Sequence, residues 1–478
     1  MSRVMFGRTT IFSNAEKINR ENVLKELSEA INTHVLNSSD IDYLYNYRKG
    51  NQPILSRIKE ARSEICAKIV VNLADYIVSF KAGYLMGSPV QYVTREQDNS
   101  GDDVTLMNRY MNYECKAKKD FELASWFYTC GVAYRLIEPN EEFDLNDAEK
   151  TSPFNTYILD PRNTFVVYSS SPSHKPLYAV NYVVNNEKKI YTVYTNDTVF
   201  LIDETNSAKE IISEKPHYLG AIPIIEYAAN QLKMGAFEGV ITLLDALNLT
   251  QSDRQDGVEQ FVQAILAFMG FTVEKGETER LKEEGAICIP PEADIKYLVN
   301  ELNQTQTQTL IDDMTKQILL ICGVPLQSDS GTSDSSNNGA MIIKNGWQQA
   351  EAKAQESEKY FEEPERRFLG IAVRIAKTFG ALDDLYTSNM DIRFTRRNYE
   401  DIQTKAQVLT TLLGCEKVHP LFAFEYCGMF IDPNLAYEES KKYVEELEKK
   451  QAEELRQATE EIQEESEGSV ENEEQEAV

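Results

Sequence analysis

The stretch from Gly235 to Gly270 constrains the fold of this chain more than any other. It contains no proline, and its apolar residues repeat at helical spacing. A continuous helix of this length would span about 50 Å, which exceeds the width of a small domain. The stretch therefore predicts a helix that reaches beyond its own domain. A polar interval, Thr250 to Gly257, interrupts the apolar face. This interval is either a solvated turn between two shorter helices or a polar face on one long helix.

The composition is that of a folded protein, because 42% of the 478 residues are hydrophobic and 10% are aromatic. A chain of this length suggests about two to four structural units. No uncharged run reaches the length of a transmembrane helix, and the seven cysteines include no CxxC pair. We therefore expect free thiols in a reducing compartment, no membrane association and assembly in a cytoplasm.

The formal net charge is -28, and the segment from Glu438 to Val478 holds sixteen Glu against four Lys and one Arg. An acidic surface repels nucleic-acid phosphates, which disfavours tight groove binding. It is compatible with DNA that slides through a channel, where adhesion would hinder movement. The C-terminal stretch predicts a disordered, solvated tail or a source of repulsion toward DNA or other subunits.

The first half of the chain predicts an α+β unit. Helical patterns occur at residues 22–36, Ile65 to Gly83 and 104–131. From Gly131 to Tyr227 the apolar period shifts toward two, and β-branched and aromatic residues dominate. Turn signals separate the candidate strands, so we expect a mostly antiparallel sheet.

The second half is mostly helical. A compact insert from Phe271 to Asn303 follows the long helix, and a second helix is predicted from Thr307 to Cys322. After a Ser/Asp/Asn/Gly-rich loop comes a long helix from Ala340 to Gly380, which Pro364 is expected to kink. A late strand at 391–395 is expected to pair far back in the chain, with a strand of the β-rich unit.

No enzyme signature is present. The sequence lacks a phosphate-binding P-loop and the GxGxxG, GxSxG and HExxH motifs. Its four histidines are widely spaced, which disfavours a His-based metal or acid–base cluster. We therefore predict a protein without enzymatic activity, bound cofactor or metal.

Several blocks of the sequence together resemble the portal proteins of tailed bacteriophages, in particular those of siphophages with Gram-positive hosts. The resemblance touches most of residues 45–345 and depends on the order of the blocks. These blocks are NLADYIVSFKAGYLMGSPVQY (72–92), ILDPRNTFVVYSS (158–170), PLYAVNYV (176–183), PHYLGAIPIIEY (216–227), GAFEGVITLLDALN (235–248) and SDRQDGVEQF (252–261).

The resemblance implies a portal-type α+β fold with an α+β wing, a two-helix stem, a small α/β clip, a long kinked helix and a helical crown. Without it, two helices around a compact insert would equally fit a hairpin inside one domain. The implied boundaries are residues 1–235 for the wing with 381–399 returning to it, 236–270 and 306–326 for the stem helices, 271–305 for the clip, 327–339 for the tunnel loop, 340–380 for the long helix, 400–460 for the crown and 461–478 for the acidic disordered tail.

Two groups of site residues follow from the resemblance. In the stem, Asp253, Arg254, Asp256 and Glu259 are expected to face the channel or a neighbouring subunit. The tunnel loop is expected to project toward DNA, although its composition is also that of a plain linker. Because it contains no lysine or arginine, a passive contact is favoured over a phosphate grip. Its residues are Gln327, Ser328, Asp329, Ser330, Gly331, Thr332, Ser333, Asp334, Ser335, Ser336, Asn337 and Asn338.

The implied function is a ring at one capsid vertex of the virion, typically dodecameric, for packaging and ejection of the viral genome. The implied partners are double-stranded DNA bound without sequence specificity, the terminase large subunit, the head–tail adaptor, and the major capsid and scaffolding proteins. Two alternatives stay open on the sequence alone: an enzymatic subunit of the packaging machinery, such as a nuclease or ATPase, and a scaffold or adaptor that binds only proteins.

Overall fold

The computed structural model forms two compact units. The first contains residues 1–333 and 343–397, and the second contains 334–342 and 398–478. The structure describes residues 7–60, 63–95, 101–145, 151–185, 188–205, 208–262, 265–269, 294–298, 304–326, 346–383, 385–396, 402–415, 417–430 and 433–453.

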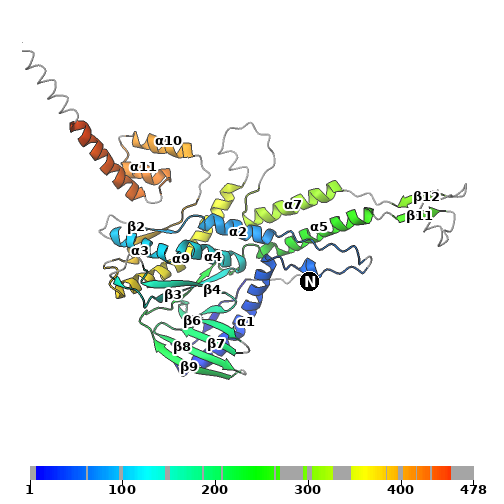
Figure 1. Cartoon of the computed structure of the whole chain (residues 1–478), viewed down its shortest axis with the longest axis horizontal. Helices are drawn as coiled ribbons and strands as arrows, with labels where there is room; N and C mark the ends of the chain where they lie inside the picture. The colour runs from blue at the N-terminus through cyan, green and yellow to red at the C-terminus, as the bar shows by residue number, and fades with distance from the viewer. Residues whose placement is uncertain are drawn as a thin grey trace, which may run out of the picture. The chain divides into compact units, whose positions relative to one another are not determined.

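A six-stranded sheet in the first unit has one face covered by helix α1 (Val23–Arg48) (Figure 1). The strand order is β1-β5-β6-β7-β8-β9, and all neighbours are antiparallel except β1 and β5. Val23, Leu27 and Ala30 of α1 pack on inward side chains of the sheet such as Phe165 and Tyr191. The strands are β1 (Ile11–Ser13), β5 (Thr164–Ser169), β6 (Pro176–Asn185), β7 (Lys188–Tyr194), β8 (Thr198–Thr205) and β9 (Ala208–Pro216).

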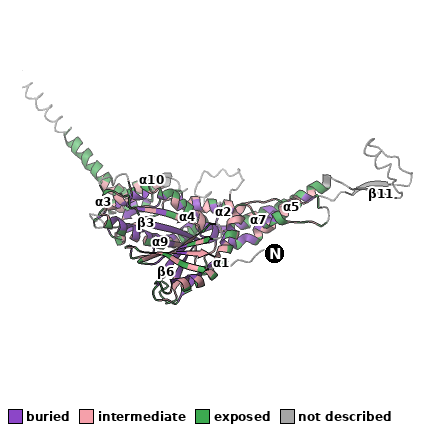
Figure 2. Cartoon of the chain, turned by 60° about the horizontal axis from the view of Figure 1, so that its bottom comes forward, coloured by how far each residue is buried: buried purple, intermediate pink, exposed green. Residues whose placement is uncertain are grey.

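A second, three-stranded antiparallel sheet has the order β10-β3-β4, and helices α4 (Lys116–Cys130) and α9 (Trp347–Thr378) pack against it. Its residues join the larger of two hydrophobic cores, which we call the body core. Figure 2 shows buried residues concentrated around α4, α9 and β3. The strands are β3 (Val132–Pro139), β4 (Phe154–Leu159) and β10 (Ile224–Ala228).

A small two-stranded sheet joins the two halves of the first unit. Strand β13 (Met390–Arg393) pairs antiparallel with β2 (Gln91–Thr94). The late strand therefore pairs far back in the chain as expected, but the expectation of a partner in the β-rich unit is wrong, because β2 precedes that stretch. The remaining elements of this part are η1 (Pro53–Ser56), α2 (Leu73–Met86), α3 (Gly101–Tyr113) and η4 (Thr387–Asn389).

A helical hairpin consists of α5 (Ile241–Val262) and α7 (Gln304–Cys322), with the one-turn η3 (Glu238–Val240) before α5. The prediction of one helix as far as Gly270 is wrong at its end. Residues Ile265–Met269 form strand β11, whose five residues pair antiparallel with β12 (Asp294–Leu298). These residues take the hydrogen-bonding partners of a strand, so the helix cannot continue through them. The polar interval from Thr250 to Gly257 lies inside α5 and does not break it.

The second unit contains α10 (Ile402–Leu413), α11 (Pro420–Cys427) and a helix over residues 433–453. Helix α10 packs on α11, and Phe424 of α11 contacts the rings of Phe430 and Tyr437. The acidic tail predicted at 461–478 lies outside the described residues. The predicted fold class, α+β with a mostly antiparallel sheet region, is confirmed.

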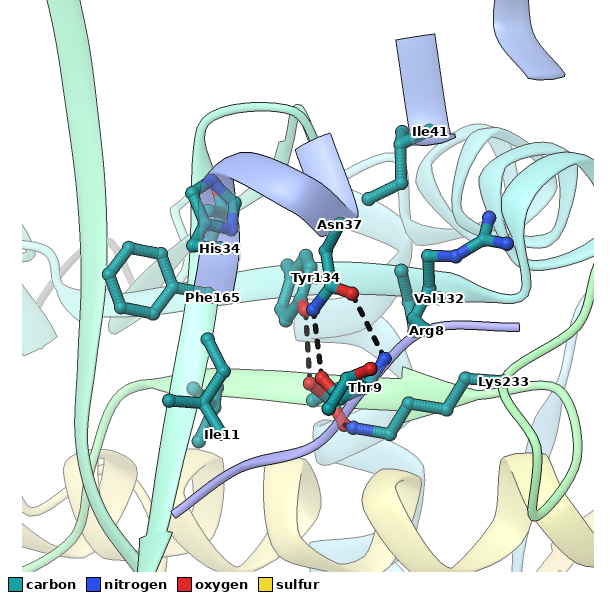
Figure 3. A pocket seen from close by; sticks show the side chains of 13 residues that line it. Arg8, Thr9, Ile11, His34, Asn37, Ile41, Val132, Tyr134, Phe165 and Lys233 are labelled. Atoms are coloured by element: carbon teal, nitrogen blue, oxygen red, sulfur yellow. Dashed lines mark hydrogen bonds and ion pairs between the residues drawn. The ribbon is translucent and has the colours of Figure 1, made fainter. Parts of the chain in front are cut away.

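A cavity of about 10 Å³ lies between the N-terminal strand, α1 and both sheets, and it is the size of one water molecule (Figure 3). Asn37 exchanges two hydrogen bonds with the backbone of Thr9 beside it. His34 lines the cavity and stacks on Phe165, with ring centroids 4.4 Å apart. Burial lowers the pKa of His34 to about 4. This histidine is therefore neutral near pH 7 and belongs to the core.

Candidate functional site on the helical hairpin

The base of the hairpin is fixed by close backbone packing. Gly131 ends α4 with a φ of 79°, and a Cβ there would lie 2.1 Å from the carbonyl oxygen of Lys233. A Cβ on Gly235 would lie 2.3 Å from the carbonyl oxygen of Thr129. The Glu238 carboxylate accepts hydrogen bonds from the Gly235 N–H at 2.8 Å and from buried Arg8 at 2.6 Å. The first residues of the hairpin are thus packed directly on the end of α4.

Three polar side chains on one face of α5 hold the extended residues 67–71. These residues end a longer segment, which begins with η1 and which we call the seam segment (residues 53–60 and 63–71). Asn248 Oδ1 accepts from the N–H of Val71 at 2.7 Å, and Ser252 Oγ accepts from the N–H of Ile69 at 3.0 Å. Asp256 Oδ1 accepts from the N–H of Ala67 at 2.6 Å. All three side chains are buried. We call this ladder of hydrogen bonds the α5 seam.

The hydrogen bonds can repeat along the seam because the spacing of residues in α5 matches the spacing in the extended segment. Four helical residues rise about 6 Å along α5, and two extended residues advance about 6.6 Å. Every fourth residue of α5 therefore meets every second residue of the antiparallel segment. The apolar pattern predicts a helix from Ile65, but α2 begins only at Leu73. The N–H groups of residues 67, 69 and 71 bond to α5 side chains instead of to carbonyls of their own helix.

Basic side chains of the seam segment surround Asp256. Arg57 lies 3.2 Å from its Oδ2, and Lys59 pairs with the same oxygen. Burial alone would raise the pKa of Asp256. The hydrogen bonds from Lys59 and from the Ala67 N–H, with the nearby positive charges, outweigh burial and lower the pKa. The carboxylate is therefore charged near pH 7 and fastens the segment to the helix.

The opposite flank of α5 faces α7. Arg254 Nη1 donates to Gln308 Oε1 at 2.7 Å, and Gln308 Nε2 donates to Asp312 Oδ1 at 2.6 Å. At the other end of α7, Lys81 Nζ donates to the carbonyl oxygen of Cys322 at 2.8 Å. A cation at the C-terminus of a helix is favourable because the last carbonyls lack partners there.

The structure separates the four predicted stem residues. Asp253 is exposed and pairs with Arg57, Arg254 contacts α7, and Glu259 is exposed. Asp256 is buried against the seam segment and accepts from the N–H of Ala67, so the expectation that it faces a channel or a neighbouring subunit is corrected. Sequence reasoning missed Asn248, which lies before the polar interval. Its four-residue spacing to Ser252 and Asp256 was the available signal.

The predicted tunnel loop, Gln327 to Asn338, lies outside the described residues. The described chain before it ends at Leu326, where the N–H of Val324 donates to the carbonyl oxygen of Leu319 at 2.9 Å. After it, Trp347 contacts the rings of Phe80 and Tyr84, with centroid distances of 5.9 Å and 6.0 Å. On either side of these residues, the described chain therefore contacts α2, through Lys81 at Cys322 and through Phe80 and Tyr84 at Trp347.

Sequence reasoning also missed a cluster of charges in the body core. Lys116 and Asp120 of α4, Arg135 of β3 and Glu365 of α9 lie together, each no more than 4% exposed. Lys116 Nζ lies 2.8 Å from Glu365, Arg135 lies 3.1 Å from Glu365, and Arg135 also pairs with Asp120. Burial would raise the pKa of Glu365, but the charges of Lys116 and Arg135 lower it. The four formal charges cancel, so burial is tolerated.

Within the described residues, no group of three or more His, Cys, Asp or Glu side chains is arranged to hold a metal ion. Nor does any helix in the described part of the chain have the length and apolar character needed to cross a membrane. The site is therefore best described by its packing surfaces.

Comparison with known proteins identifies a family. A family model described as "Phage portal protein, SPP1 Gp6-like" matches residues 27–468. No curated protein matches the chain. Among solved structures, the chain is similar to the neck of an empty gene transfer agent particle, with 10% identity, a TM-score of 0.45, and coverage of 75% of this chain and 90% of that one.

Two further structures have the same coverage of 75% and 90%. One is the virion of a native gene transfer agent particle, with 10% identity and a TM-score of 0.43. The other is the neck of the native particle computed with C12 symmetry, with 11% identity and a TM-score of 0.42. The family assignment depends on the family model, which matches all but the two ends of the chain. The chain therefore belongs to the SPP1 Gp6-like family of phage portal proteins, and its role is that of the virion's portal ring in packaging and ejecting the genome.

Proposed function

We propose that twelve copies of this chain form a closed ring whose α5–α7 hairpins line an axial conduit for double-stranded DNA. The observation that carries the proposal is the hairpin itself, a two-helix projection whose described residues pack on the rest of the chain at its base and along the α5 seam (Figure 1). The acidic composition suits DNA that passes without adhesion or sequence readout. In this ring, Asp253, Arg254 and Glu259 face the conduit or the next subunit, while Asp256 positions the seam segment.

The residues from Gln327 to Asn338 form the tunnel loop of this proposal. Their Ser/Asp/Asn/Gly composition favours mobility and a weak, steric contact with DNA. The aromatic contacts of Trp347 and the bond from Lys81 to the end of α7 support it, because they fix the described chain on either side of the loop.

The remaining assignments complete the portal. Residues 1–235 with 381–399 form the wing, 236–270 and 306–326 the stem, 271–305 the clip, 340–380 the long kinked helix and 400–460 the crown. The clip docks the terminase large subunit during packaging and the head–tail adaptor afterwards. The wing and crown meet the major capsid and scaffolding proteins. The phage is a siphophage of a Gram-positive host, assembly occurs in the host cytoplasm, and the protein has no enzymatic activity of its own.

Deletion of Ser328 to Ser336 tests the role of the loop. The variant should assemble rings as the wild type does, but it should package or retain less DNA in an assay with the terminase. A matched variant with the loop at full length, carrying Asp329→Ser and Asp334→Ser, should package normally because the contact is steric. Normal packaging by the deletion variant would refute a functional loop.

A further inference from the structure

Helix α5 lies between two different neighbours. On one flank it contacts α7 through Arg254 and Gln308, and on the other it holds the seam segment through Asn248, Ser252 and Asp256. Figure 1 shows the same order, with α7 on one side of α5 and the extended trace after α1 on the other. The hairpin therefore presents two chemically different outer flanks, the exposed face of α7 and the seam segment.

A closed ring with one chain type needs heterologous interfaces, in which each subunit offers two different faces to its neighbours. We propose that the exposed face of α7 in one subunit packs against the seam segment of the next. This inference rests on the proposed ring and names the surfaces that close it.

Residues on the two flanks lie at matching levels along the hairpin. Arg254 contacts Gln308, so these two residues lie at the same height along the hairpin. In the same way, Ser252 lies at the height of Ile69, and Asp256 at the height of Ala67 on the seam segment. Rotation about an axis parallel to the hairpin preserves these levels. Residues near Gln308 in one subunit therefore meet residues near Lys68 and Arg57 in the next.

Exposed apolar side chains occur on both flanks at this level. Ile58 is 86% exposed and Leu55 is 43% exposed on the seam segment, and Leu310 of α7 is 51% exposed. Leu310 lies two residues from Gln308, and Ile58 follows Arg57, which reaches Asp253 of α5. Burial of so exposed an isoleucine against a neighbouring subunit is favourable, because it removes apolar surface from water.

Charge complementarity supports the same pairing. Lys68 is exposed between the two seam residues Ala67 and Ile69. Asp313 is exposed on α7 and lies on the same side of the helix as Leu310, because residues three apart are neighbours on a helix surface. A lysine side chain is long enough to bridge an offset of one turn. Lys68 of one subunit therefore meets the Asp313 carboxylate of the next.

Charge reversal tests the pairing in the full-length protein. The variant Asp313→Lys should lose rings in native mass spectrometry at a concentration where the wild type is assembled, while its thermal midpoint as a monomer stays unchanged. Adding Lys68→Asp to the same chain should restore rings, because every interface regains one opposite-charge pairing. The control is Lys25→Asp, at an exposed position of α1, and this variant should assemble normally.

A second pair of variants tests the apolar contact. Ile58→Ser should raise the protein concentration needed for ring assembly about tenfold or more, because part of an isoleucine's burial is lost at each interface. Ile212→Ser on β9, where the side chain is 57% exposed, should leave assembly unchanged. Rings that form equally well in the charge-reversed and Ile58→Ser variants would overturn this interface and leave the ring proposal standing. A wild type that forms no rings would overturn both.

Discussion

The body core and the hairpin use buried polar groups in opposite ways. In the body, Lys116, Asp120, Arg135 and Glu365 neutralise one another and join α4, β3 and α9 into one unit. In the hairpin, Asn248, Ser252 and Asp256 fasten a single extended segment, and the outer flanks stay exposed. In the body the buried charges are thus compensated within the chain, whereas the hairpin leaves apolar side chains such as Ile58 and Leu310 exposed on its outer flanks.

Removing one charge of the body cluster should lower the free energy of unfolding more than any other substitution considered below. Arg135→Met leaves Asp120 and Glu365 buried with only Lys116 to compensate them, so the free energy of unfolding should fall by about 3–5 kcal/mol. Urea denaturation measures this. The matched control is Arg367→Met, which removes an exposed pair with Glu363 on α9 and should cost less than about 1 kcal/mol. Equal effects of the two substitutions would show that the cluster does not stabilise the body.

The buried His34 makes the stability of the body depend on pH. His34 is neutral in the folded body with a pKa of about 4, and its ordinary value is about 6.5. The unfolded chain binds this proton more readily, so the stability that neutral His34 contributes is lost as pH falls from about 6.5 to 4. At pH 5 the loss should be about 2 kcal/mol. The difference in unfolding free energy between the wild type and His34→Gln should shrink by this amount between pH 7 and pH 5. A constant difference would contradict the assignment.

The smallest effect concerns the α5 seam. Ser252→Ala removes the acceptor for the Ile69 N–H and should cost about 1–2 kcal/mol. Amide hydrogen exchange should quicken at Ala67, Ile69 and Val71. The control is Ser28→Ala in α1, because both hydroxyls donate to the carbonyl four residues earlier but only Ser252 holds a distant N–H. If exchange at Ile69 is unchanged in Ser252→Ala, the seam does not hold the segment.

Much of the fold was predictable where the period of the apolar residues determines the structure. The strands between Gly131 and Tyr227 and the helix after Thr307 lie close to their predicted positions. The prediction of a helix from Ile65 is wrong because N–H groups of this stretch bond to side chains of α5. The bonded residues are about 180 positions apart in the sequence, so no local pattern indicates the contact. The predicted end of α5 is wrong because an apolar run such as residues 265–269 is compatible with either a helix or a strand. Pairing with residues 294–298 makes this run a strand.

The site was less predictable than the fold. One common role is predicted for four neighbouring stem residues, Asp253, Arg254, Asp256 and Glu259. A helix, however, turns neighbouring residues to different sides. Asp256 therefore lies in the seam while Arg254 faces α7. The body cluster gave no local signal, because its four charges come from three elements that only the tertiary fold brings together.

Electron microscopy of the purified full-length protein tests the central claim most directly, because the claim is that the exposed flanks of the hairpin close a ring. The account predicts rings with an axial channel wide enough for duplex DNA, lined by the α5–α7 hairpins. Monomers or open filaments at high protein concentration would contradict it.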